Sequence, residues 1–66
     1  MATLKAFFES DFCTDDTIIK AITNYKYGAP LVRKGRWYED VIIKLSDREV
    51  TYMEWVDGSV EIILAD

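Results

Sequence analysis

The sequence predicts an α+β fold in which one or two N-terminal helices pack on a three-stranded antiparallel β-meander. Two observations support this fold class: apolar residues recur at helical spacing in the first half of the chain and at alternate positions in the second half. The chain has 66 residues and 50% of them are apolar, which is enough for one small core. We therefore expect a single compact domain over residues 1–66.

The opening stretch, residues 3–12, fits two kinds of structure. Leu4, Phe7 and Phe8 have helical spacing, and Thr3 stands where its hydroxyl can cap the first turn. Alternate apolar residues in the same stretch would also allow an edge strand. We favour a short helix.

The clearest predicted helix covers residues 15–27. Thr14 can cap its first turn, and the two aspartates that follow suit the positive end of the helix dipole. Gly28 and Pro30 are typical of the end of a helix, so residues 29–35 are predicted to form a loop. Four large apolar side chains complete one helical stripe: Ile18, Ile19, Ile22 and Tyr25.

Three strands are predicted in the C-terminal half, over residues 36–46, 50–56 and 59–64. Apolar and polar residues alternate in each of them. Asp57 and Gly58 separate the last two strands and are typical of a type I′ hairpin turn, which needs positive φ at both central residues. This turn fixes the strand register.

The predicted register of the last hairpin places Glu54 directly opposite Glu61, where like charges destabilise a sheet. The other predicted pairs are Val56 with Ser59, Trp55 with Val60, Met53 with Ile62, and Thr51 with Leu64. For the first hairpin, the register that keeps the apolar faces together pairs Val41 with Trp55, Ile43 with Met53, and Leu45 with Thr51.

The composition argues against several kinds of functional site. The chain has no histidine and a single cysteine, so it lacks the residues for an internal disulfide, a Cys/His zinc site or a histidine-activated nucleophile. We expect Cys13 to be buried and unreactive. We therefore expect no enzyme activity, no cofactor and no metal. The absence of a long apolar run and of paired cysteines predicts a cytoplasmic protein without a membrane segment.

Charge is segregated along the chain. Residues 37–66 carry eight acids and two bases, whereas residues 17–36 carry five bases and no acid. The predicted register gathers the acids on the outward sheet face among apolar side chains, and an exposed apolar patch of this kind is typical of a contact surface. The alternative is that the N-terminal segment or a second copy covers this face. The predicted partner-binding residues are Glu39, Asp40, Tyr52, Glu54, Asp57 and Glu61, with Tyr38, Ile42, Val56 and Ile63 between them.

An acidic and aromatic sheet face suits a protein partner that has a basic nucleic-acid-binding surface, because carboxylates can occupy Arg and Lys contacts made for phosphates. In its size, its acidic meander over residues 37–66 and its predicted single main helix, the chain resembles the small acidic anti-CRISPR and anti-restriction inhibitors encoded by phages. That resemblance implies a non-catalytic inhibitor that acts in the host cytoplasm and blocks nucleic-acid access to a DNA-surveillance complex.

Two other functions remain open. The same face can support self-association as a structural or regulatory module, with Tyr52, Ile42 and Ile63 at the centre of a homodimer and the acids at its rim. Direct nucleic-acid binding would instead use the basic run that precedes Trp37, which consists of Arg33, Lys34 and Arg36. The net charge of −4 makes direct nucleic-acid binding the weaker of these alternatives.

Overall fold

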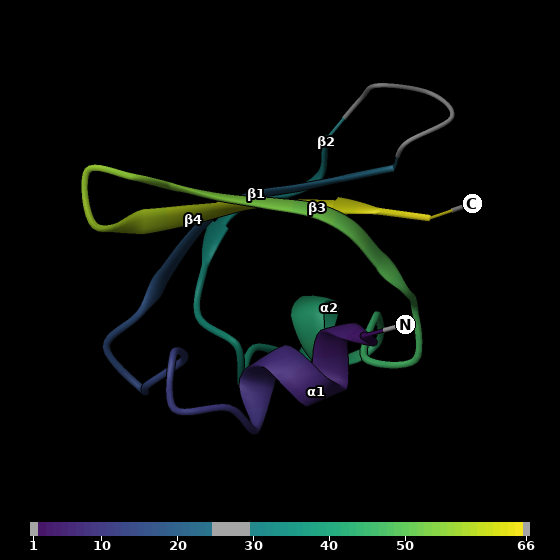
Figure 1. Ribbon diagram of the computed structural model, residues 1–66, viewed down its shortest axis with the longest axis horizontal. Helices are drawn as coiled ribbons and strands as arrows, with labels where there is room; N and C mark the ends of the chain where they lie inside the picture. Colours follow the sequence, from purple (N-terminus) through teal and green to yellow (C-terminus); the bar gives the residue numbers. More distant parts are fainter. Residues whose placement is uncertain (1, 25–29, 66) are drawn as a thin grey trace.

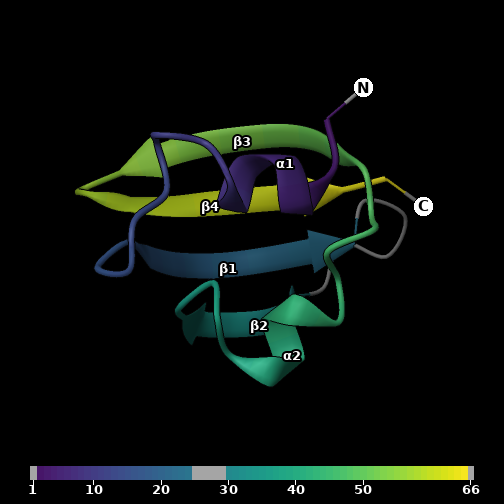
Figure 2. The ribbon, with the colours of Figure 1, turned by 90° about the horizontal axis from the view of Figure 1, so that it is seen from below.

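The computed structural model describes residues 2–24 and 30–65, and it shows an α+β fold of two layers (Figures 1 and 2). One layer is a four-stranded sheet with strand order β2-β1-β4-β3, in which β1 and β4 run parallel and the two outer pairs are antiparallel. The other layer contains two short helices, both on the same face of the sheet. The elements, in chain order, are α1 (Leu4–Phe8), β1 (Ile18–Asn24), β2 (Pro30–Gly35), α2 (Asp40–Ile43), β3 (Val50–Val56) and β4 (Ser59–Leu64).

The hairpin of β3 and β4 confirms the prediction made from its turn. Asp57 and Gly58 have φ values of 51° and 81°, as a type I′ turn requires. The predicted pairs from Val56–Ser59 to Met53–Ile62 are present, including Glu54 opposite Glu61. The predicted pair of Thr51 with Leu64 is wrong, because a register shift places Val50 opposite Leu64.

The short N-terminal helix is also confirmed. α1 begins after Thr3, whose hydroxyl accepts a hydrogen bond of 3.2 Å from the backbone N–H of Ala6. The backbone N–H of Leu4 donates to the carbonyl of Arg48 at 2.9 Å, which fastens α1 to the segment that leads into β3. α1 packs on the face of the sheet that the core occupies, so it does not cover the predicted binding face (Figure 1).

The predicted helix over residues 15–27 is wrong, because residues 18–24 form the central strand β1; residues 25–27 and Gly28 lie outside the described part of the chain. The stretch is rich in β-branched residues, which favour strands. A bulge at Lys20 explains the misleading pattern: it brings Ile19 and Ile22 to the same face although they are three residues apart. The helical spacing in the sequence is therefore the spacing of a bulged strand.

Two further elements differ from the prediction. The predicted loop over residues 29–35 contains the edge strand β2 within its described part, so the sheet has four strands and is mixed, not a three-stranded meander. The predicted strand over residues 36–46 is wrong, and with it the register of the first hairpin. One helical turn, α2, forms there because the fully buried Ile42 packs over Gly35, where an added Cβ would lie 2.8 Å from its Cδ1 atom. Tertiary packing has overridden local β-propensity.

The core lies between the sheet and the helices. Its centre is the parallel pair of strands, whose inward apolar side chains are fully buried, and both helices and Cys13 contribute to it. A core of this size leaves little excess stability, so each buried side chain matters. The buried apolar side chains are Leu4, Phe7, Cys13, Ile19, Ile22, Ile42, Val60, Ile62 and Leu64.

We predict that Gly58→Ala destabilises the fold by about 1–2 kcal/mol, because a left-handed backbone conformation is costly for a residue with a Cβ. The added methyl group meets no atom within 4 Å, so the cost arises from the backbone alone. Urea unfolding followed by circular dichroism measures it. Asp57→Asn is the control and should unfold at the wild-type midpoint, since asparagine suits the same turn. An unchanged midpoint for Gly58→Ala would show that the turn does not hold this conformation.

Candidate functional site

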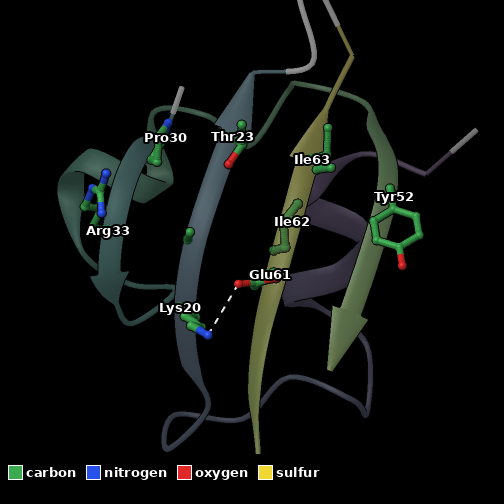
Figure 3. Close-up of a pocket in the computed structure, with 9 residues that line it drawn as sticks. Lys20, Thr23, Pro30, Arg33, Tyr52, Glu61, Ile62 and Ile63 are labelled. Atoms are coloured by element: carbon green, nitrogen blue, oxygen red, sulfur yellow. Dashed lines mark ion pairs between the residues drawn. The ribbon is translucent and has the colours of Figure 1, made fainter. Parts of the chain in front are cut away.

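The open face of the sheet, opposite the helices, is the candidate binding surface (Figure 3). Strand pairing sets its side chains in rows that cross all four strands. One row contains Pro30, Thr23, Ile63 and Tyr52, and it is mainly apolar. The next contains Arg33, Ala21, Glu61 and Glu54. The first two rows line a hollow of about 350 Å³.

The bulge in β1 shapes this face as well as the core. Lys20 is the additional residue in β1 relative to β4, and both Lys20 and Ala21 line the hollow on the open face. On β2, the neighbouring Lys34 has a φ of 48°, in the left-handed region that few side chains adopt. The two irregular positions together place Lys20, Arg33 and Lys34 on the same part of the sheet.

Charge on the open face is divided at the junction of β1 and β4. We call Lys20, Arg33 and Lys34, on β1 and β2, the cationic half. The acidic half lies on β3, β4 and their turn and consists of Glu54, Asp57 and Glu61. A second hollow, of about 330 Å³, lies at the end of the face where Lys34 and Asp57 both line it.

One ion pair joins the two halves: within residues 2–24 and 30–65, the pair between Lys20 Nζ and Glu61 Oε1, at 3.5 Å, is the single salt bridge (Figure 3). Both side chains are more than a third exposed, so solvent screening limits its contribution to stability to less than about 1 kcal/mol. Arg33 and Glu54, further from the junction, have no ion-pair partner among these residues. The charges of the face are therefore largely available to another molecule.

The structure brings four of the six predicted site residues together and separates the other two. Tyr52, Glu54 and Glu61 lie on the open face with Asp57 at its edge. The prediction that Asp40 lies on this face, with Glu39 nearby on the same strand, is wrong. Both belong to the α2 turn on the helical side, where the Glu39 carboxylate accepts a 2.6 Å hydrogen bond from the Arg36 N–H. The cause is the helix that replaces the predicted strand.

The apolar residues predicted on the open face are also divided. Val56 and Ile63 lie on it, whereas Ile42 is buried in the core and Tyr38 packs edge-on against Trp37, with ring centroids 5.7 Å apart. The sequence-based prediction did not place Lys20 or Arg33 on this face: Lys20 fell in the predicted helix, and Arg33 fell in the predicted loop, where it was a candidate for nucleic-acid binding only. No local signal identifies them, since their position depends on the pairing of β1 and β2.

The basic run that was considered for nucleic-acid binding is not a loop with a free aromatic platform. Arg33 and Lys34 belong to β2, and the Arg36 guanidinium donates a 3.1 Å hydrogen bond to the Asp15 carbonyl. The indole N–H of Trp37 donates to the Asp15 carboxylate at 3.0 Å, and its ring lies 6.0 Å from that of Phe8. Trp37 thus packs on the helical side, away from the cationic half.

Comparisons of the chain with protein-family models, curated proteins and solved structures gave no match. The open face therefore has to be interpreted from its own chemistry. In the described part of the chain, no group of three or more His, Cys, Asp or Glu side chains is arranged to hold a metal ion. No helix among the described residues has the length and apolar character needed to cross a bilayer.

Cys13 is the one nucleophilic thiol of the chain, and its environment suppresses its reactivity. It is buried, as predicted, and burial raises the pKa of its thiol above the ordinary value of 9.0; the charge of Asp15 raises the pKa further. The thiolate is the reactive form, and a raised pKa keeps Cys13 in the unreactive thiol form at neutral pH. This supports a packing role for Cys13.

We predict that iodoacetamide alkylates Cys13 more slowly at pH 8 in the native protein than in urea. A raised folded-state pKa also means that the thiol's contribution to stability is complete below the unfolded pKa and is lost as pH rises through the folded pKa. As pH rises above the ordinary thiol pKa of 9.0, wild type should lose more unfolding free energy than Cys13→Ala, in which the other titrating groups are unchanged. Equal alkylation rates in buffer and urea, or equal losses of unfolding free energy, would contradict this account.

Proposed function

We propose that this chain is a non-catalytic protein-interaction module that self-associates through its open sheet face. The observation that carries the proposal is the combination, on one sheet face that neither described helix covers, of an apolar row with separate cationic and acidic halves. Tyr52 is 52% exposed and lies beside Ile63, so the monomer leaves a large apolar side chain in water. A partner that covers this face removes that apolar area from solvent.

The division of charge favours a second copy of this chain as the partner, in preference to a protein with a purely basic surface. A basic surface that covers the whole face would meet Lys20 and Arg33 as well as the carboxylates, and like charges in contact oppose binding. The open face of a second copy has both cationic and acidic residues. The face has three cationic and three acidic residues, so two copies can satisfy each other's charges completely.

We predict that the purified chain dimerises at high protein concentration, and that the dimer weakens but remains detectable from about 0.1 M to about 1 M salt, because the shorter Debye length screens its charge pairs and leaves its apolar contacts. Tyr52→Ala should shift it towards monomer, because it removes the largest apolar contact. Light scattering over a concentration series measures the mass. Tyr38→Ala is the matched control: Tyr38 is 48% exposed but lies on the helical side, and its loss should leave the dimer intact. A monomer at every concentration, or an equal effect of the two substitutions, would overturn the proposal.

The acidic half favours a second candidate function, an inhibitor of a nucleic-acid-binding complex. Glu54, Asp57 and Glu61 lie on the hairpin of β3 and β4, whose register is fixed by its tight turn. Carboxylates held in this way can occupy Arg and Lys contacts that otherwise bind phosphate. A CRISPR-type DNA-surveillance complex in a host cytoplasm is a partner of this chemistry. In this case the contact would involve the acidic half and Tyr52 without the cationic half.

We predict for this candidate that the chain lowers duplex DNA binding by an RNA-guided surveillance complex in a gel-shift assay, and that the effect weakens as salt rises. Glu54→Lys should abolish the inhibition and leave the fold intact. Asp47→Lys, on the helical side, makes the same charge change and should retain full inhibition. Unchanged DNA binding in the presence of wild-type chain would exclude the complex that was assayed as the target.

A further inference from the structure

The sheet is nearly symmetric about the junction of β1 and β4. These two central strands run parallel, and each has an antiparallel neighbour on its outer side, β2 beside β1 and β3 beside β4. A half-turn about an axis that runs along the strands at this junction exchanges β1 with β4 and β2 with β3. No strand changes direction in this exchange. When a second copy is placed by this half-turn, each row of the open face therefore faces the same row of the second copy.

Two symmetric ways of stacking one open face on another have opposite electrostatic consequences. With the two-fold axis across the strands, each strand lies over its own counterpart, so the cationic half meets the cationic half of the second copy. With the axis along the strands, β2 lies over β3 and β1 over β4, so the cationic half meets the acidic half. Only the second arrangement brings opposite charges together, and contacts of opposite charge favour association.

We infer that the open face binds a second copy of this chain about a two-fold axis along the β1–β4 junction; the inference rests on the self-association proposed above. Arg33 of one copy then faces Glu54 of the other. Stacked sheets lie about 10 Å apart, and long side chains from both sides span that distance. The remaining facing pairs are Lys34 with Asp57, Lys20 with Glu61, Tyr52 with Pro30, and Ile63 with Thr23.

This arrangement also relieves repulsion within each copy. Glu54 and Glu61 are direct cross-strand neighbours. Lys20 and Lys34 likewise lie between the paired positions of β1 and β2. Like charges placed in this way destabilise an isolated sheet. A facing copy with the opposite charges offsets the repulsion in both halves at once.

The size of the face sets the expected strength of the dimer. Four strands spaced by about 4.8 Å, each with about six residues at 3.3 Å, give a footprint of roughly 400 Å² per copy. The total of roughly 800 Å² is below the size of a standard stable interface. We therefore expect a weak, rapidly exchanging dimer, and the test must cover concentrations from about 1 μM to about 1 mM.

The test is a charge exchange between the two facing positions. Arg33→Glu and Glu54→Arg should each weaken the dimer about tenfold, because the two-fold symmetry places two repulsive pairs in every dimer. The double variant, Arg33→Glu with Glu54→Arg, restores opposite charges and should dimerise within about threefold of wild type. Sedimentation equilibrium gives the dissociation constants, and circular dichroism with urea unfolding confirms that each variant is folded.

Controls on the helical side make the same changes in net charge away from the open face. Lys44→Glu matches Arg33→Glu, and Asp47→Arg matches Glu54→Arg; neither should alter the dissociation constant.

If Arg33→Glu instead strengthens the dimer, the axis runs across the strands and this inference is wrong, although self-association stands. If both single variants weaken the dimer and the double variant does not restore it, Arg33 and Glu54 do not face each other. A wild-type chain that remains monomeric at about 1 mM overturns both the inference and the proposed function.

Discussion

Ile19 and Ile22 both reach the core from one strand although three positions separate them, and the bulge at Lys20 is what allows it. These two side chains lie beside the buried side chains of β4 and form the centre of the core. The bulge turns Lys20 and Ala21 to the opposite face in the same step. The same bulge therefore brings two isoleucines into the core and places the cation of Lys20 at the middle of the open face.

The division of charge on the open face follows from strand order more than from composition. The acids and bases are segregated along the chain, and a meander of the C-terminal half alone would present an almost wholly acidic face. The parallel pairing of β1 with β4 instead inserts the basic segment into the same sheet. A chain with a net charge of −4 thus has an open sheet face on which three cationic and three acidic residues balance. Net charge alone is a poor guide to what such a face binds.

The parts of the fold that the sequence predicts are those with local causes. The turn at Asp57 and Gly58 fixes the register of β3 and β4, and Thr3 caps α1 as expected. β1 and α2 depend on partners distant in sequence: the bulge disguises a strand as a helix, and Ile42 packs over Gly35 in place of extending a strand. The acidic half of the candidate site was therefore predictable from its hairpin, whereas the cationic half was not.

The stability and the proposed association of this chain make opposite demands on the same residues. Each half of the open face sets like charges side by side, Glu54 by Glu61 and Lys20 near Lys34, and a core of this size has little stability to spare for such repulsion. Neutral residues at Glu54 and Lys34 would remove this repulsion and keep the Lys20–Glu61 ion pair, so we expect them to give a more stable monomer. They would also remove the contrast between the halves that selects one stacking of two copies over the other. The proposed association would offset in the dimer the repulsion that each half of the open face carries in the monomer.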